Sequence, residues 1–175
     1  MTFSPQITKT NFMKSIITTA LFACSTLLLT AGNKASVGQA MPNLAELLPG
    51  AKLPATAGKV VLVDFWASWC QPCLASFGSM ARLQKTYSAK GLVIIGISVD
   101  EDNDKFKGFV AKQKPNFTVA RDEGHKAAAF FSPPKMPTSY LVDRKGKIRF
   151  IHKGFKGAAT EAEYTKEIET LLAEK

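Results

Sequence analysis

The sequence is poor in the residues that build several common kinds of site. Its 175 residues include only three cysteines and two histidines. A structural disulfide framework would need more cysteines at wider spacing. A zinc site would need a second CxxC pair or two closely spaced histidines, and the sequence has neither. These absences argue against a disulfide-stapled scaffold and a zinc domain, and we expect no metal ion and no cofactor.

Patterns typical of repeat proteins and nucleic-acid-binding proteins are also missing. The chain has no internal repeat and no low-complexity tract. Its formal net charge is +9, but the basic residues are scattered, apart from a turn-like group at residues 144–147. Without a basic stripe interleaved with aromatics, we expect no nucleic-acid partner. A hydrophobic content of 46% is instead typical of one globular domain with a sizeable core.

The first 40 residues contain no acidic residue and have the pattern of an export signal. Lys9 and Lys14 precede an uncharged apolar stretch at residues 15–29. Candidate cleavage positions with small residues follow at Ala31, Ala35 and Ala40. This order of charge, apolar stretch and small residues predicts a secretory signal peptide.

Two other interpretations of this segment stay open. It could be an uncleaved membrane anchor, although its apolar run of about 15 residues is short for a span. Alternatively, Leu21-Phe22-Ala23-Cys24 resembles the lipidation motif of a lipoprotein. All three interpretations place the protein outside the cytoplasm, with residues 1–40 as signal peptide or anchor and residues 41–175 as the folded domain.

The most informative stretch leads into two cysteines separated by two residues. Residues 60–65 are a nearly continuous, β-branched apolar run that predicts a buried strand. From Pro72 onward a helix is expected, because proline is well tolerated in a helix's first turn. Cys70 would precede this helix, where unpaired N–H groups and the helix dipole stabilise a thiolate. Cys73 lies one turn further on, close enough to form a disulfide with Cys70, so the stretch predicts a thiol–disulfide exchange site.

Strands and helices alternate along the rest of the predicted chain. The leader at residues 38–57 contains three prolines and cannot hold a long helix. Gly91 is expected to end the first long helix. Strands are predicted at residues 59–66, 92–99, 116–120, 139–143 and 147–152, and helices at 72–89, between the acidic residues 100–104 and Pro115, at 125–131 and at 158–175.

Two further patterns concern the ends of these helices. The acidic run at residues 100–104 is interpreted as a solvated N-terminal cap of the next helix, because its order does not fit a calcium-binding loop. Residues 160–163 resemble a capping box for the last helix. That helix would bury an apolar stripe formed by Tyr164, Ile168, Leu171 and Leu172.

Residues 63–73, Val-Asp-Phe-Trp-Ala-Ser-Trp-Cys-Gln-Pro-Cys, resemble the active-site segment of the thioredoxin superfamily. The resemblance extends over residues 59–155, and an extra helix and strand before residue 121 is similar to the TlpA/ResA-type exported thiol-disulfide oxidoreductases. It implies an α/β thioredoxin fold, with a central mixed sheet flanked by helices and a helix–strand insertion between its βαβ and ββα halves. It also implies a monomeric protein-disulfide oxidoreductase that reduces disulfides in exported proteins and takes electrons from a membrane-bound donor.

The resemblance implies roles for four residues of this segment. Cys70 is the attacking thiolate, and Cys73 is the resolving thiol. Asp64 matches a buried aspartate that assists proton transfer at the second cysteine. Burial raises the pKa of a carboxyl group and suits it to acid–base catalysis near neutral pH; the alternative is a strand acid that faces solvent. Trp69 matches a tryptophan that shields the sulfurs or contacts partners.

The resemblance also identifies residues that shape the site. Gln71 and Pro72 are the two residues between the cysteines, which related proteins vary to tune their redox poise. Met136, Pro137 and Thr138 match a loop in which the peptide bond before proline is cis. The backbone of Met136 could then pair with an extended substrate segment. An ordinary trans proline at a strand start is the alternative.

The chain departs from the TlpA/ResA pattern at Ser76 and Gly78, where Glu and Pro are usual. The departures bear on the finer assignment, reduction of haem-binding cysteines in cytochrome c biogenesis, and leave dithiol exchange unaffected. Two rival functions are a copper-delivery protein of the same fold and a thiol peroxidase. The first normally has three residues between its cysteines plus a distal histidine, whereas His125 and His152 are isolated here. The second has its reactive cysteine in a different local sequence.

Overall fold

The computed structural model describes residues 1, 2, 4 and 34–174. The predicted signal segment, including Cys24, therefore lies largely outside the described residues. In the part that is described, none of the helices combines the length and apolar character needed to cross a bilayer.

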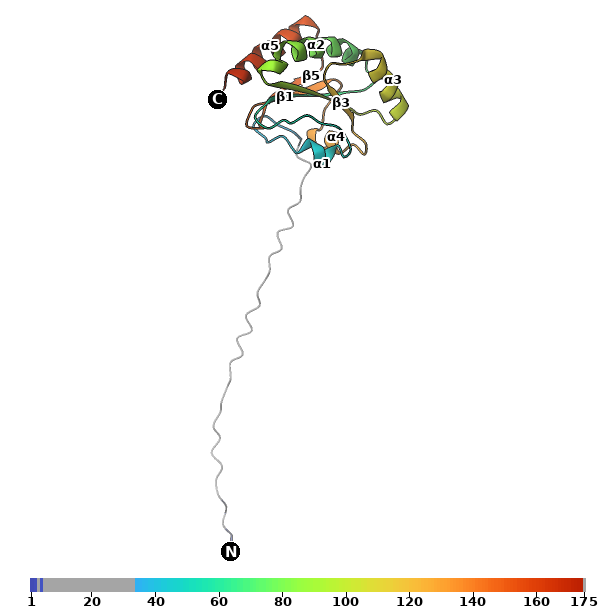
Figure 1. Ribbon diagram of the computed structural model, residues 1–175. Coiled ribbons are helices and arrows are strands. Elements are labelled where there is room, and N and C mark those ends of the chain that lie inside the picture. The colour runs from blue at the N-terminus through green and yellow to red at the C-terminus, as the bar shows by residue number, and fades with distance from the viewer. Residues whose placement is uncertain (3, 5–33, 175) are drawn as a thin grey trace. The chain divides into compact units, whose positions relative to one another are not determined.

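A five-stranded mixed sheet forms the centre of the fold (Figure 1). Its strands lie in the order β3-β2-β1-β4-β5. Strand β1 pairs in parallel with β2, and β2 does so with β3, whereas the β1–β4 and β4–β5 pairs are antiparallel. This arrangement confirms the mixed sheet that the family resemblance implies. The strands are β1 (Val60–Trp66), β2 (Leu92–Ser98), β3 (Thr118–Arg121), β4 (Thr138–Val142) and β5 (Ile148–Lys153).

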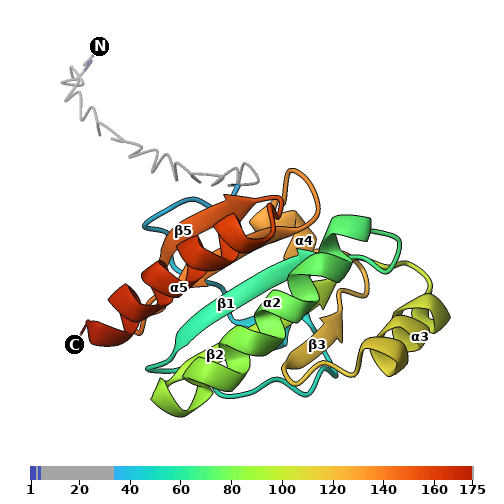
Figure 2. The same cartoon turned by 90° about the horizontal axis from the view of Figure 1, so that it is seen from above.

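Helices cover both faces of the sheet, which explains why β1 is buried along its whole length (Figure 2). Helices α2 (Gln71–Tyr87) and α5 (Ala158–Ala173) pack on one face. The short helices α1 (Leu44–Leu47) and α4 (Lys126–Phe131) pack on the other. Because successive side chains of a strand alternate between faces, residues 60, 62, 64 and 66 point toward α2 and α5. Asp64 therefore lies on the face that carries α2, the helix that follows Cys70.

The predicted element boundaries agree with the structure to within two residues for most elements. Helix α2 ends at Tyr87 and is followed by a 3₁₀ turn, η1 (Ser88–Lys90). Gly91, with a φ of +105°, then leads directly into β2, which confirms its predicted role in ending the helix. The insertion between the two halves comprises α3 (Asn103–Gln113) and β3, as the resemblance implies, and α4 follows them.

Two predictions about helix ends were wrong in part. Helix α5 begins after Gly157, so Thr160 lies inside the first turn; its hydroxyl accepts a hydrogen bond from the Lys156 N–H (3.0 Å) and is not an N-cap. In the acidic run, Asp102 does cap α3 by accepting from two backbone N–H groups. Asp100, in contrast, is buried and accepts hydrogen bonds from the Ser68 N–H in the turn between β1 and α2. Its burial depends on partners distant in sequence, which no local pattern reveals.

The segment just before α1 packs against the hairpin of β4 and β5. Ala35 is buried in the core on the α1/α4 face. The Gly38 N–H donates to the Ile148 carbonyl (2.7 Å), and the Ile148 N–H donates to the Gln39 carbonyl (2.9 Å). The compact body of the described chain therefore begins before residue 41.

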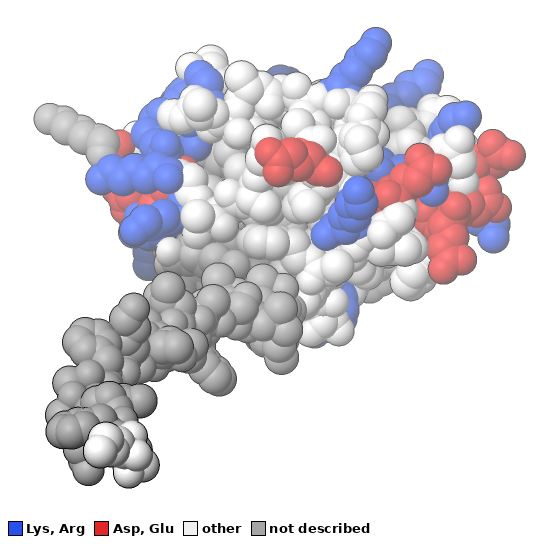
Figure 3. All heavy atoms as spheres, turned by 90° about the horizontal axis from the view of Figure 1, so that it is seen from below, with Lys and Arg blue, Asp and Glu red and all other residues white. Residues whose placement is uncertain are grey.

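Figure 3 shows how the charged side chains are distributed over one face of the molecule. On the face seen in Figure 3, Lys, Arg, Asp and Glu side chains gather toward two sides and leave the middle largely uncharged. Basic side chains form no continuous stripe across the part of this face that the described residues leave visible.

Candidate active site

The two cysteines of the CxxC motif form a disulfide at the start of α2. Cys70 is the N-cap residue of this helix, with an extended backbone (φ −89°, ψ 102°). Cys73 lies one turn later, and the two Cα atoms are 5.3 Å apart. The Cys73 N–H points at the Cys70 Sγ atom (3.3 Å). A sulfur in this position receives both a backbone donor and the positive end of the helix dipole, and both favour its thiolate form.

The two sulfurs differ in their access to solvent. Cys70 is 6% exposed, whereas Cys73 is completely buried. Trp69, which directly precedes Cys70, is 70% exposed and is one of the few large hydrophobic side chains at the surface of the described chain. An incoming disulfide would therefore meet Cys70 and Trp69 first, and Cys73 could react only from within.

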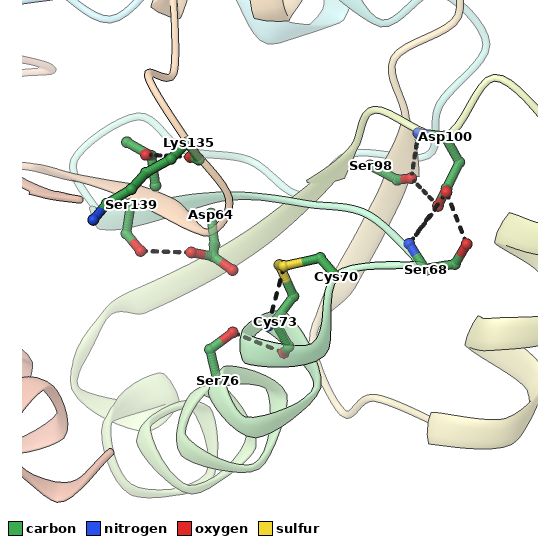
Figure 4. The surroundings of a disulfide bond; sticks show 10 residues. Asp64, Ser68, Cys70, Cys73, Ser76, Ser98, Asp100, Lys135 and Ser139 are labelled. Atoms are coloured by element: carbon green, nitrogen blue, oxygen red, sulfur yellow. Dashed lines mark hydrogen bonds between the residues drawn. A yellow bond between two sulfur atoms is a disulfide. The ribbon is translucent and has the colours of Figure 1, made fainter. Parts of the chain in front are cut away.

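Asp64 lies behind the disulfide and is shut off from water. Its side chain comes from the middle of β1 and is only 1% exposed. Burial raises the pKa of Asp64 from 3.8 to about 7, and a hydrogen bond from Ser139 opposes part of that increase. In Figure 4 one carboxylate oxygen meets Ser139, while the other lies on the side of the disulfide. That second oxygen, Oδ2, has no hydrogen-bond partner among the described residues.

Two hydroxyl groups, from Ser139 and Tyr164, are linked to Asp64 by hydrogen bonds. Ser139, opposite Asp64 in the pairing of β1 and β4, donates from its Oγ atom to Asp64 Oδ1 (2.5 Å). The Tyr164 hydroxyl of α5 lies 2.7 Å from the same Ser139 oxygen. Sequence reasoning placed Tyr164 in an apolar stripe, and nothing in the local pattern indicated that its hydroxyl would reach the site.

Asp100 fixes the loop that carries the first cysteine. Both of its carboxylate oxygens accept hydrogen bonds from the Ser68 N–H (3.1 and 2.9 Å). They also accept from the hydroxyls of Ser68 (2.8 Å) and Ser98 (2.7 Å). This buried side chain therefore ties the turn between β1 and α2 to the end of β2 (Figure 4). Sequence reasoning missed this contribution to the site.

The proline loop lies at the end of β1 nearest the cysteines. The Met136–Pro137 peptide bond is cis, as the resemblance implies. Thr138 pairs with Phe65 in the sheet, and its hydroxyl donates to the Lys135 carbonyl (2.7 Å). The Pro137 carbonyl accepts from the Gly154 N–H (2.7 Å). Strand pairing on one side and this contact on the other hold the loop beside the active-site turn.

The two positions that depart from the TlpA/ResA pattern lie within α2. Ser76 is buried, and its hydroxyl donates to the Cys73 carbonyl (2.9 Å), so no carboxylate occupies this position. Gly78 does not interrupt the helix, which runs without a break from Gln71 to Tyr87. Gln71 and Pro72 form its exposed first turn.

The histidines do not assemble a metal site in the described part of the chain. His125 precedes α4 and is exposed. His152 of β5 contacts Glu167 (2.6 Å) and Glu163 (3.4 Å) of α5. No group of three or more His, Cys, Asp or Glu side chains suited to a metal ion occurs among residues 34–174.

Comparison with known proteins identifies the family. The model of the AhpC/TSA family matches residues 37–151. This chain belongs to the AhpC/TSA family of thioredoxin-like proteins. It also resembles proteins named thiol-disulfide oxidoreductase ResA. A relative from Bacillus cereus is 36% identical over 118 residues, which are 66% of this chain and 68% of the relative. A relative from Bacillus thuringiensis subsp. konkukian is 33% identical over 142 residues, 79% and 82% of the two chains.

Solved structures agree with this membership. A Chlorobium tepidum protein provisionally named thiol:disulfide interchange protein DsbE has a TM-score of 0.73 and 33% identity, covering 80% of this chain and 100% of its own. A secreted disulfide oxidoreductase from Mycobacterium tuberculosis, 22% identical, shares the fold with a TM-score of 0.58, covering 66% and 84%. The relatives are named thiol-disulfide oxidoreductases, and Cys70 and Cys73 form a disulfide with CxxC spacing. This AhpC/TSA family member is therefore a protein thiol-disulfide oxidoreductase.

Proposed function

We propose that this enzyme works as a reductant of disulfides in proteins outside the cytoplasm, with Cys70 as nucleophile, Cys73 as resolving thiol and Asp64 as proton acceptor. The observation that carries the proposal is the difference between the two sulfurs. Cys70 sits at the helix start within reach of solvent, whereas Cys73 is sealed on the same side of the sheet as a buried carboxylate. The roles that we propose for the other site residues depend on this difference between the two cysteines.

The first half-reaction forms a mixed disulfide. In the reduced enzyme the Cys70 thiolate attacks one sulfur of the substrate disulfide, whose S–S bond breaks as a new bond to Cys70 Sγ forms. The released substrate thiolate takes a proton from solvent. Trp69 and the backbone of Met136 would contact the substrate chain, while the exposed Gln71 and Pro72 lie next to Cys70 in the first turn of α2. Pro137 and Thr138 hold the Met136 backbone in place.

The second half-reaction resolves the mixed disulfide. The Cys73 thiol passes its proton to Asp64, and the resulting thiolate attacks Cys70 Sγ. The Cys70–Cys73 disulfide forms as the second substrate thiolate leaves and is protonated. Two electrons have then moved from the enzyme's dithiol to the substrate. A carboxyl group with a pKa of about 7 is suited to accepting this proton near neutral pH.

The buried carboxylate also supports the reducing direction. A negative charge in a site of low polarity opposes a second negative charge on a nearby sulfur. It therefore opposes the stabilisation that the helix start gives the Cys70 thiolate, and a dithiol that is stabilised less gives up electrons more readily. We expect a reduction potential closer to the about −270 mV of thioredoxin than to the about −120 mV of DsbA. A value near the latter would indicate an oxidase.

The cysteine variants test the mechanism with a protein disulfide such as insulin as substrate. Cys70→Ser should abolish reduction, because no accessible nucleophile remains. Cys73→Ser should accumulate a mixed disulfide through Cys70, visible as a mass increase that a reductant reverses. Turnover that survives Cys70→Ser would exclude this mechanism. Stoichiometric copper binding by the reduced protein with negligible turnover would favour the metal-delivery alternative instead.

Export remains part of the proposal and makes a specific prediction about the mature chain. Of the three candidate cleavage positions, Ala31 is the one whose use retains Ala35 and the pairing of Gly38 and Gln39 with Ile148. We therefore place the mature N-terminus before residue 35, and the domain boundary with it. Mass spectrometry of the exported protein should find this start. A chain beginning at Met41 would contradict it, and a retained or lipidated N-terminus would identify a membrane tether.

The partners follow from the chemistry. We propose that the enzyme acts as a monomer on disulfide-containing exported proteins and is re-reduced by a membrane-bound thiol–disulfide donor. Because Ser76 stands where the TlpA/ResA branch usually has Glu, we propose general disulfide reduction rather than a dedicated role in cytochrome c biogenesis.

A further inference from the structure

Three buried side chains from three separate elements are joined by hydrogen bonds next to the disulfide. They are Asp64 of β1, Ser139 of β4 and Tyr164 of α5, and each is at most 1% exposed. The Ser139 Oγ atom lies 2.5 Å from Asp64 Oδ1 and 2.7 Å from the Tyr164 hydroxyl oxygen. The mechanism above uses Asp64 alone, so the two hydroxyls need an explanation of their own.

The direction of the two hydrogen bonds follows from counting protons. An ionised carboxylate can only accept, so the single hydroxyl proton of Ser139 goes to Asp64 Oδ1. The Tyr164 proton must then go to Ser139 Oγ, because this hydroxyl has no other acceptor among residues 34–174. Both hydroxyl protons are satisfied in this arrangement. In Figure 4 the Asp64 oxygen that faces the disulfide is the one without a partner.

We propose that Tyr164 and Ser139 form a one-way hydrogen-bond chain, Tyr164 to Ser139 to Asp64, that orients the carboxylate and reserves Oδ2 for the proton exchanged with Cys73. Tyr164 and Ser139 are thus positioning residues, which act on the reaction through Asp64. The inference rests on the proposed proton transfer, because only that step needs a free oxygen on the disulfide side.

The reverse chain is the alternative. In it, Asp64 carries its proton on Oδ1 and donates to Ser139, which donates to Tyr164. The phenolic proton is then left buried without an acceptor, which is unfavourable. In the proposed direction, a proton on Oδ2 faces the sulfur that supplies and recovers it. The two directions therefore place the proton on opposite sides of the carboxyl group.

The sign of one measured shift separates the two directions. In the proposed chain Ser139 stabilises the ionised carboxylate, so Ser139→Ala should raise the pKa of Asp64 above its value of about 7 by about one unit. In the reverse chain Ser139 stabilises the protonated form, and the same substitution should lower the pKa. Tyr164→Phe should raise it by a smaller amount, because Ser139 keeps its own hydrogen bond but loses the donor behind it.

The measurement is a carbon-13 NMR titration of the Asp64 carboxyl group in the oxidised protein. The intact disulfide removes both thiols from the titration, and Asp64→Asn identifies the signal. Other ionisable groups surround these three side chains, so a His152→Gln variant shows the effect of the histidine whose ring packs against Tyr164, with the ring centroids 4.7 Å apart. The remaining ionisable groups are Lys135 of the loop before β4, His152 of β5, and Glu163 and Glu167 of α5, because Cys70 and Cys73 are joined in the disulfide.

Tyr140→Phe is the matched control. Tyr140 adjoins Ser139 in β4 but points to the opposite face, where its hydroxyl donates to the Phe131 carbonyl (2.8 Å). Its removal should leave the Asp64 titration unchanged. Ser139→Thr, which keeps the hydroxyl, should restore the wild-type value, and Tyr164→Phe carries the test should Ser139→Ala not fold.

The outcome for the chain can be told apart from the outcome for the mechanism. A lower or unchanged pKa of Asp64 in Ser139→Ala would contradict the proposed hydrogen-bond chain, whatever the activity of the variant. An upward shift supports it. If the pH profile of mixed-disulfide resolution then moves upward with the titration, Asp64 also has the proposed role. If the pKa of Asp64 rises but the pH profile of mixed-disulfide resolution does not move, the hydrogen-bond chain is supported and the proton-transfer role of Asp64 is excluded.

Discussion

Replacing Asp64 by asparagine should make the oxidised protein more stable at neutral and alkaline pH. Asparagine has nearly the same shape and still offers an oxygen to Ser139, but it carries no charge that must be buried. The wild-type protein keeps the charge because the reaction uses it. The substitution should therefore raise the free energy of unfolding and lower the activity.

The size of the effect follows from the titration of Asp64. Burial raises its pKa from 3.8 to about 7, a difference of about three units. At about 1.36 kcal/mol per unit, ionised Asp64 lowers the free energy of unfolding by up to about 4 kcal/mol. Below about pH 4 both the folded and unfolded states are protonated, and this loss disappears. It grows as the pH rises toward 7, because the unfolded state releases its proton first, and it is complete above that value.

Urea unfolding of the oxidised proteins at pH 4, 6 and 8 would measure the difference. The advantage of Asp64→Asn over wild type should be small at pH 4, intermediate at pH 6 and largest at pH 8. Activity in disulfide reduction should fall at the same time, with resolution of the mixed disulfide as the slowed step.

Asp100→Asn is the matched control, because Asp100 is also a buried aspartate in the same site. Both of its oxygens accept hydrogen bonds from Ser68 and Ser98, so an amide NH₂ would face other donors. At neutral pH this variant should lose about 1–3 kcal/mol of unfolding free energy. A pH-independent difference for Asp64→Asn, or a loss at pH 8 as large as that of Asp100→Asn, would refute the reasoning.

Two further substitutions test other parts of the structure. Trp69→Ala should change the free energy of unfolding by less than about 0.5 kcal/mol, because the side chain is 70% exposed. The kcat/KM of this variant should nevertheless fall about tenfold for a protein disulfide and little for a small disulfide. An equal fall for both substrates would exclude a role of Trp69 in substrate docking. Gly96→Ala would place a Cβ atom 3.1 Å from Trp66 Nε1 and 3.2 Å from Val119 Cγ1. Urea unfolding should show a loss of about 1–3 kcal/mol, and unchanged stability would mean that the core relaxes around the added methyl group.

The fold was largely predictable because its signals are local. The apolar run at residues 60–65, the proline after Cys70 and the glycine at position 91 each indicate one strand or helix boundary. The CxxC spacing brings two sulfurs together through one turn of helix, without any long-range contact. The proline loop was found through a family resemblance, which carried information that spacing alone does not.

The rest of the site depends on contacts between residues far apart in the chain. Asp100 stands in an acidic run that is otherwise exposed, and its buried partners include Ser68, 32 residues earlier, which the local sequence does not indicate. Tyr164 has the spacing of an apolar stripe, and its hydroxyl gains a role only because α5 packs over β4. Polar residues in such positions cannot be told from surface or core residues until the sheet brings their partners together.

The division of labour between the two sulfurs is the central claim, and a limited alkylation of the reduced protein tests it most directly. A small amount of iodoacetamide at neutral pH should modify Cys70 almost alone, as mapped by mass spectrometry of the peptides, because this sulfur combines helix-start stabilisation with access to solvent. Equal modification of the two cysteines, or faster modification of Cys73, would contradict the account.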